Sequence, residues 1–423
     1  ISINERIQVL KQQLKLSLQS FNIFPLIPPS TDEHQLRNQR ISTRIFIILL
    51  TLSLTVLILY TSLVNTTKTT DINSPTITQY TQLYATYPQT LTCACTQISI
   101  DYDKFIQVNY KLHQICISIF VNHTWILYLV NARSSDLFTD DFRASGTFIF
   151  QALNAFCQLS NQIITNRLTQ FYSSQYISAS VTPLQVLMSQ TQSLVSQFKS
   201  SITNDFLLSL LTIRTTTQSN SLFSGQFTNY YLVRENNNDV YSYYHFYGNC
   251  SCASSATCAY ESPIYDPSDN VIFIVPGIYI GCYIIEALLQ SNLQCFYNET
   301  CINKIQSYFT YYLSMNLTTL DASLLIGFHM NSTIQELVDE LMVEEWNNAT
   351  IYDGYYNECQ PSKCSYSYQG KNGVIYIITT VIGLVGGLIT VLKLIVPRAV
   401  RLVMFCIRRY TVKHNAVSPS IQT

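Results

Sequence analysis

Two long apolar stretches without a charged residue divide the chain. The first, Ile45–Val64, has 20 residues, and the second, Val374–Leu392, has 19 before Lys393. At about 1.5 Å per residue, a helix of either length crosses the roughly 30 Å apolar layer of a bilayer. Buried helices of soluble proteins seldom run this far without a charge on any face. The pattern therefore predicts two transmembrane helices, over residues 45–64 and 374–396.

Residues 65–373, between the two spans, have shorter patterns that mix helix and strand. Residues 104–220 are predicted to be mostly helical, and within them Leu184–Phe198 has apolar positions at helical spacing. Residues 225–310 favour short strands, because Tyr, Val, Ile and Cys are frequent there and polar turn clusters interrupt them. The fold class predicted is a membrane protein in which two transmembrane α-helices flank a large, disulfide-rich, extracellular α+β domain.

Two segments of this domain have a sharper pattern. Thr333 and Glu336 have the spacing of a capping box, and the apolar positions that follow predict a helix with this buried stripe: Ile334, Leu337, Val338, Leu341 and Met342. Val271–Leu289 is apolar, but it contains Pro276-Gly277 and Glu286, and a third span there would move the basic tail outside. We therefore expect a buried strand, a Pro-Gly turn and the start of a helix in that segment.

Charge is distributed unevenly along the chain, although its total is −1. Residues 1–44 carry six basic and three acidic residues, residues 393–423 carry six basic residues and no acid, and the middle holds 12 basic and 22 acidic residues. Basic flanks usually face the cytoplasm, so the head (1–44) and the tail (397–423) are expected to be cytoplasmic. Ile3–Leu18 has the pattern of a basic amphipathic helix on the inner leaflet or against a partner helix. An isoleucine at position 1 is typical of a fragment or an incomplete gene model.

Cysteines and glycosylation signals fall almost wholly between the spans. Cys406 is the one of 13 cysteines outside them. An even number in a secretory compartment predicts up to six disulfides of open connectivity among Cys93, Cys95, Cys116, Cys157, Cys250, Cys252, Cys258, Cys282, Cys295, Cys301, Cys359 and Cys364. All Asn-x-Ser/Thr acceptors lie in the same interval, with Asn65 close to the membrane, and the glycosylation candidates are Asn122, Asn249, Asn298, Asn316, Asn331 and Asn348. The interval is therefore expected to be extracellular at the plasma membrane.

The sequence has no motif of a known catalytic chemistry. It lacks a Gly-x-Ser-x-Gly elbow, a His-Glu-x-x-His helix, a phosphate-binding glycine loop and a dinucleotide fingerprint. Cys93-Ala94-Cys95 and Cys250-Ser251-Cys252 have the chemistry to bind a soft metal, but disulfides are the expected state in an oxidising compartment. We therefore expect no enzymatic activity, no cofactor, no metal and no nucleic-acid partner.

The second apolar stretch carries a stripe of small residues on one helical face. Its members are spaced so that helix backbones can approach closely: Thr379, Gly383, Gly386, Gly387 and Thr390. In one interpretation, the stripe packs against Thr51 and Thr55 of the first span. In the other, several copies of the chain meet and the stripe lines a pore.

The layout and two motifs resemble a family of ion channels. A Thr-Cys-Ala-Cys stretch (92–95) follows the first span, and a Gly-Leu-Val-Gly-Gly-Leu run (383–388) lies in the second. Their positions are similar to features of the degenerin/epithelial sodium channel family, which implies an oligomeric two-pass cation channel. The glycine-x-serine selectivity tripeptide of that family is absent, and Lys393 stands where the family tends to have an acid. The chain also resembles uncharacterised two-pass, cysteine-rich invertebrate membrane proteins through His113–Cys116 and Tyr376–Thr380, which implies no activity.

Topology and cysteine content together favour a two-pass plasma-membrane glycoprotein that acts as a non-conducting cell-surface receptor or adhesion protein. In this hypothesis the spans anchor the extracellular domain in the lipid bilayer, and an unknown extracellular ligand or partner binds to it. The alternative is a degenerin-like homo-oligomeric cation channel in which the second span lines the pore. The acidic middle region would then concentrate cations near the mouth of the pore.

Overall fold

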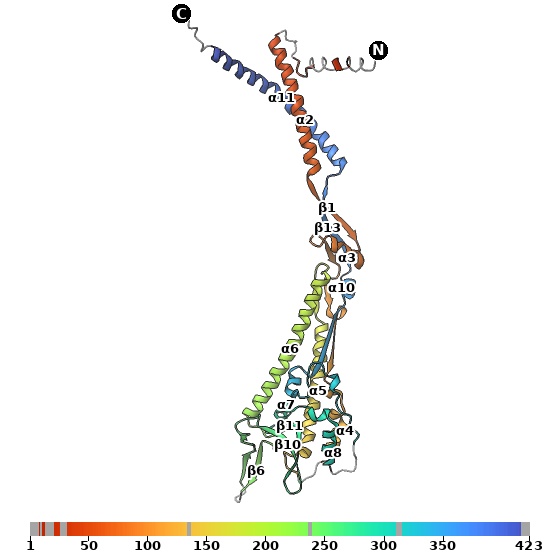
Figure 1. Ribbon diagram of the computed structural model, residues 1–423, viewed down its shortest axis with the longest axis vertical. Coiled ribbons are helices and arrows are strands. Elements are labelled where there is room, and N and C mark those ends of the chain that lie inside the picture. The colour runs from red at the N-terminus through yellow and green to blue at the C-terminus, as the bar shows by residue number, and fades with distance from the viewer. Residues whose placement is uncertain are drawn as a thin grey trace. The chain divides into compact units, whose positions relative to one another are not determined.

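The computed structural model describes residues 8, 11–12, 21–25, 32–132, 137–235, 239–309 and 315–415. The chain divides into two compact units, and their elements are labelled in Figure 1. The first unit comprises Ile1–Asp71, Thr86–Leu91 and Ser365–Thr423, and the second comprises Ile72–Ala85 and Thr92–Cys364. The amphipathic helix expected over Ile3–Leu18 lies almost wholly outside the described residues.

Two long helices of the first unit contain the apolar stretches. α2 runs over Glu33–Leu63 and α11 over Val374–Asn415, and both are long and apolar enough to cross a membrane. α2 begins before the expected span because Asp32 caps it, its carboxylate accepting a backbone N–H of the first turn. α11 continues beyond its expected end and includes Pro397, whose ring removes one backbone hydrogen bond without ending the helix. Both candidate transmembrane helices therefore extend into their basic flanks.

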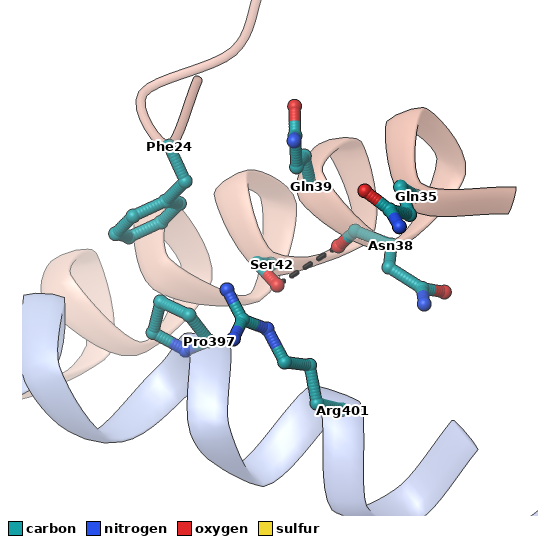
Figure 2. A pocket seen from close by; sticks show the side chains of 7 residues that line it. All are labelled: Phe24, Gln35, Asn38, Gln39, Ser42, Pro397 and Arg401. Carbon is teal, nitrogen blue, oxygen red and sulfur yellow. Dashed lines mark hydrogen bonds between the residues drawn. The ribbon is translucent and has the colours of Figure 1, made fainter. Parts of the chain in front are cut away.

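α2 and α11 lie side by side near their basic ends (Figure 2). Phe46 of α2 packs with Val396 and Val400 of α11 in a buried cluster. Ile23 and Phe24, from the chain before α2, pack against the same cluster. Apolar contacts therefore hold the two helices together at this end.

One strand follows α2, and another precedes α11. β1 (Asn65–Asn73) lies beside β13 (Pro361–Lys371). Between β13 and α11, the Asn372 amide nitrogen donates to the Thr61 carbonyl of α2 at 2.9 Å. The last turn of α2 and the chain that enters α11 are thus joined at the end opposite the basic flanks.

The second unit is built around α5 (Phe142–Tyr172) and α6 (Leu184–Ser219), which lie side by side in Figure 1. Phe150 of α5 meets Trp125 and Phe296 edge to face in the core. Helix predominates over residues 104–220, as expected, apart from two short strands. The shorter helices are α3 (Ile77–Thr86), α4 (His123–Ala132), α7 (Ile284–Gln290), α8 (Glu299–Ser307), α9 (Ile334–Asp339) and α10 (Tyr352–Cys359).

The strands of the second unit form mainly antiparallel pairs. These pairs are β3 (Ser99–Asp101) with β5 (Gln175–Ile177), β4 (Ile106–Leu112) with β12 (Val343–Thr350), β6 (Tyr230–Arg234) with β7 (Val240–Tyr244), β8 (Phe246–Tyr247) with β9 (Cys250–Ser251), and β10 (Ala259–Tyr265) with β11 (Val271–Gly281). β2 (Thr92–Cys95) pairs with β13. Short strands therefore occupy much of residues 225–310, as the sequence predicts.

The expected turn at Pro276-Gly277 is a bulge inside a continuous strand. β11 passes through this pair, and its register against β10 shifts between Glu261 and Pro263. Gly277 has a φ of +79°, and a Cβ there would meet the side chain of Asn292. The prediction of a turn was wrong because a glycine with positive φ can also bulge a paired strand. The strand itself and the helix that follows it are confirmed.

The helix predicted after Thr333 is shorter than expected. The capping box between Thr333 and Glu336 is present, but α9 ends at Asp339. Leu341 and Met342 are fully buried, yet their φ values of +52° and +58° place them in a turn before β12. The buried stripe is therefore correct in its residues and wrong in its last helical turn, because packing holds this turn in the left-handed region.

All twelve cysteines between the candidate spans form disulfides, which confirms the expectation of six. The bonds are Cys93–Cys364, Cys95–Cys359, Cys116–Cys157, Cys250–Cys258, Cys252–Cys282 and Cys295–Cys301. Cys406 of α11 is free and exposed. The chain thus has a mixed α/β region with six disulfides between two candidate transmembrane helices.

Candidate functional site

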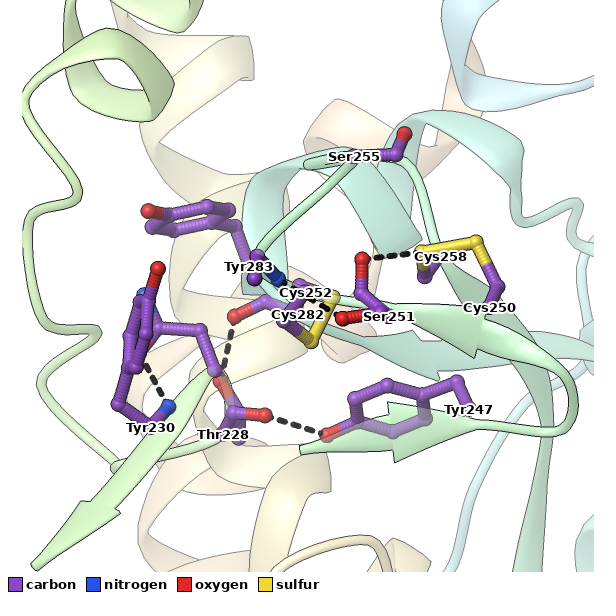
Figure 3. The surroundings of a disulfide bond; sticks show 12 residues. Thr228, Tyr230, Tyr247, Cys250, Ser251, Cys252, Ser255, Cys258, Cys282 and Tyr283 are labelled. Carbon is purple, nitrogen blue, oxygen red and sulfur yellow. Dashed lines mark hydrogen bonds between the residues drawn. A yellow bond between two sulfur atoms is a disulfide. The ribbon is translucent and has the colours of Figure 1, made fainter. Parts of the chain in front are cut away.

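Two disulfides tie the chain at β9 to the start of β10 and the end of β11, and β8 pairs with β9, which together form a compact base (Figure 3). Cys250–Cys258 links residues eight positions apart, and Cys252–Cys282 links residues 30 positions apart. Cys252, Cys258 and Cys282 are buried in one cluster with Tyr247. A cross-link of this kind limits the conformations of the chain around it, so the base is held in one arrangement.

Two fully buried polar residues, Thr228 and Asn229, join the start of β6 to this base. The Thr228 hydroxyl donates to the Cys282 carbonyl, and the Thr228 carbonyl accepts from the Tyr247 hydroxyl, both at 2.9 Å (Figure 3). Burial raises the pKa of Tyr247, so its hydroxyl remains a donor. The Asn229 amide donates to the Leu222 carbonyl at 2.7 Å. Buried polar groups with all their partners in place specify a single geometry.

β6 and β7 form a hairpin that exposes apolar side chains on both faces. Tyr231 and Tyr243 lie opposite each other with ring centroids 5.8 Å apart, and on the other face Tyr244 meets Phe246 at 5.3 Å. On this hairpin and in the chain on either side of it, residues 222–246 include ten large apolar side chains that are between 41% and 60% exposed. We call them the aromatic surface: Leu222, Phe223, Phe227, Tyr231, Leu232, Val240, Tyr241, Tyr243, Tyr244 and Phe246.

The aromatic surface is unusual for a free protein surface. A two-stranded hairpin is marginally stable in water unless another layer covers it. Large exposed apolar patches mark interaction sites, and tyrosine is enriched in interfaces because it combines a large apolar ring with a polar hydroxyl. The arrangement is therefore suited to binding, since a rigid base presents aromatic side chains that lose little entropy on contact.

An apolar pocket of about 220 Å³ opens beside the same base. Its wall includes Arg214 of α6 and Glu286 of α7, which form a two-bond ion pair at 2.5 Å and 2.6 Å. The hydrogen bonds to Glu286 raise the pKa of Arg214 above its usual value. Glu286 is 5% exposed, so this charge is buried and neutralised. The pair fixes α7 to α6 and leaves the rest of the pocket wall mainly apolar.

His113 is buried in a separate cluster with Glu344 and Tyr297. Its Nε2 atom lies 3.8 Å from a Glu344 carboxylate oxygen and 3.3 Å from the Tyr297 hydroxyl, and its Nδ1 accepts the Ile115 N–H. Burial lowers the pKa of His113 to about 4, against the opposing attraction of Glu344. The imidazole is therefore neutral at physiological pH. Within the described ranges, no three His, Cys, Asp or Glu side chains are placed to hold a metal ion.

The small-residue stripe of α11 does not contact α2. A Cβ added at Gly383, Gly386 or Gly387 would meet no atom within 4 Å of the chain as described. The hydroxyls of Thr51 and Thr55 bond to carbonyls of their own helix, as do those of Thr379 and Thr390 in the stripe. The two helices pack together at their basic ends, so the stripe has no partner among the described residues.

The asparagines of the candidate glycosylation sites are all exposed: Asn122, Asn249, Asn298, Asn316, Asn331 and Asn348. Two of these side chains also cap helical turns, Asn122 toward the Thr124 N–H and Asn298 toward the Cys301 N–H. Exposure is what the attachment of a glycan requires.

The sequence analysis located the cysteines of this site but did not predict the aromatic surface. The aromatic surface had a signal, since five tyrosines occur in the two strands of one hairpin: Tyr230, Tyr231, Tyr241, Tyr243 and Tyr244. The ion pair between Arg214 and Glu286 left no signal in the sequence, because 72 positions separate the two residues.

No protein-family model, curated protein or solved structure matches the chain.

Proposed function

We propose that the chain is a two-pass plasma-membrane glycoprotein whose disulfide-rich extracellular domain binds a protein partner through the aromatic surface. The spans anchor the domain and conduct no ions. The observation that carries the proposal is the exposure of ten large apolar side chains on and beside a hairpin whose base is held by two disulfides and two buried polar residues. Six disulfides and basic flanks at both helices support the extracellular placement of this domain.

A protein is the class of partner that this surface favours. Tyrosine-rich patches with few charges resemble the centres of protein interfaces, where aromatic anchors supply most of the binding energy. Tyr231 and Tyr243 form the stacked pair at the middle of one face. We expect them to be the main anchors, because their rings are already oriented before contact.

The test uses secreted residues 65–372, fused to a dimerising tag, on cells of the source organism. The fusion should label the cells, and the double variant Tyr231→Ser with Tyr243→Ser should reduce labelling by about tenfold or more. Ile177→Ser is the matched control, because Ile177 is 73% exposed and lies outside the aromatic surface. Equal labelling by both variants, or loss of all binding once the spans are removed, contradicts the proposal.

A second candidate is the oligomeric cation channel, which the open space beside the small-residue stripe favours. In that case copies of α11 surround a pore, and Gly387 faces water. A Gly387→Cys variant in a Cys406→Ser background has one free thiol, because the other twelve cysteines are paired. Modification by a charged, membrane-impermeant thiol reagent, together with current in expressing cells, supports the channel. If the thiol does not react and the expressing cells show no current, the result supports spans that only anchor the extracellular domain.

A further inference from the structure

A pocket of about 400 Å³ lies between α2 and α11 at their basic ends. Its volume falls within the roughly 300–1,000 Å³ range typical of ligand sites. We call it the α2–α11 pocket, and it is lined by Phe24, Gln35, Asn38, Gln39, Ser42, Pro397 and Arg401. Figure 2 shows Arg401 extending from α11 toward the polar side chains of α2. Both helices therefore contribute to one concave site.

The lining has the chemistry of an anion site. Arg401 supplies a positive charge and makes no ion pair with any described residue. Asn38 and Gln35 add amide groups, the Ser42 hydroxyl donates to the Asn38 carbonyl, and no acid is among the described residues that line the pocket. A guanidinium forms paired, charge-assisted hydrogen bonds with phosphate oxygens, and amide N–H groups complete such a shell.

The side chain of Gln39 is an independent indication that the pocket binds a group with hydrogen-bond acceptors. Its amide oxygen accepts from the Asn22 side chain at 2.7 Å, which fixes the orientation of the amide. Its amide nitrogen is buried and has no hydrogen-bond partner among the described residues. A buried donor without an acceptor costs about 1–3 kcal/mol, so a ligand oxygen at this position would relieve that cost.

The pocket extends from the expected depth of phospholipid headgroups toward the water at the basic ends. Ser42 is three residues before the apolar run of α2, about 5 Å along the helix axis, and Arg401 is five residues after Val396, about 8 Å. Gln39 and Asn38 are six and seven residues before the same run, about 9–11 Å. The headgroup layer of one leaflet is roughly 5–8 Å thick. Arg37, Arg40 and Arg44 on α2 add to the positive field without lining the pocket.

We propose that the α2–α11 pocket binds the phosphate of an anionic phospholipid headgroup from the leaflet at the basic ends of the helices. Arg401 holds the phosphate, and the amides of Asn38 and Gln39 donate to its oxygens. Basic pockets between membrane helices bind anionic headgroups in this way, because the headgroup replaces lost hydration with charge-assisted hydrogen bonds. The inference shares only the membrane placement of α2 and α11 with the proposed function and is independent of the extracellular partner.

The test is a lipid titration of the full-length chain, purified in detergent and followed by native mass spectrometry. The probes are a short-chain phosphatidylinositol bisphosphate, a short-chain phosphatidylcholine and inorganic phosphate. The wild type should bind the bisphosphate lipid and bind phosphatidylcholine at least about tenfold more weakly. Arg401→Gln should weaken binding of the anionic lipid by about tenfold, and Gln39→Leu by a smaller factor.

Arg398→Gln is the matched control, because Arg398 lies one turn before Arg401 on the same helix but outside the pocket. An equal loss of affinity in both arginine variants would show attraction by net charge alone and overturn the proposal. Displacement of the lipid by inorganic phosphate at similar concentrations would assign the pocket to a soluble phosphate and overturn the lipid assignment. The secreted residues 65–372 contain neither α2 nor α11. Cell labelling by that domain and lipid binding by the full-length chain therefore test the two proposals separately.

Discussion

The buried imidazole of His113 makes the second unit less stable in acid. Burial lowers the pKa of His113 to about 4, whereas the unfolded chain has a histidine pKa near 6.5. Between these two values the unfolded state binds more protons than the folded state, so the free energy of unfolding falls as pH decreases from about 6.5 toward 4. Glu344 attracts the protonated form, but the desolvation of a side chain that is 1% exposed is the larger effect.

The size of the effect follows from the two pKa values. Each factor of ten in proton affinity corresponds to about 1.36 kcal/mol. At pH 5 an unfolded histidine is almost wholly protonated and His113 is almost wholly neutral, so the folded state loses about 2 kcal/mol relative to pH 8. This loss corresponds to a decrease in Tm of roughly 4 °C for a unit of this size.

Urea unfolding at pH 8 and pH 5, followed by tryptophan fluorescence, measures this difference. Both tryptophans, Trp125 and Trp346, lie in the second unit, and Trp125 is buried. His113→Gln has no proton to gain, so its pH-dependent loss should be smaller than that of the wild type by about 2 kcal/mol. His123→Gln, at an exposed position, is the matched control and should retain the full loss. An unchanged pH dependence in His113→Gln would refute the reasoning.

The same urea assay at pH 7.5 checks three further predictions. Gly277→Ala should lower the free energy of unfolding by about 1–3 kcal/mol, because its φ is positive, whereas Gly225→Ala, in open space, should change it by less than about 1 kcal/mol. Joint replacement of Cys252 and Cys282 by serine opens a 30-residue loop and should cost about 3–4 kcal/mol; no loss would show that the base is rigid without this bond. Glu286→Gln leaves the arginine of α6 without its counter-charge and should cost about 2 kcal/mol, while an unchanged midpoint would contradict a structural role for the pair.

Local composition was sufficient to predict the candidate spans, because an uncharged run of 20 apolar residues has few other stable environments. The limits of the helices were less predictable. Asp32 extends α2 toward the N-terminus, and α11 accommodates Pro397, although proline usually ends a helix. Cysteine parity predicted six disulfides, but it carries no information on which cysteines pair. Cys95 and Cys359 meet across 264 positions because two strands and a helix bring them together.

At the candidate site the strands could be predicted from the sequence, but the exposure of their side chains was not. Strands were expected over 225–310, and β6 and β7 are there, but half-buried strands normally alternate apolar and polar positions. In this hairpin Tyr231 and Tyr243 lie on one face, and Leu232 and Tyr244 on the other, and all four are at least 41% exposed. When both faces of a two-stranded hairpin carry apolar residues, packing against the rest of the chain can cover only one of the two faces. The missing alternation was therefore a signal in the sequence for apolar side chains exposed on both faces, and the proposed binding of a partner rests on this exposure.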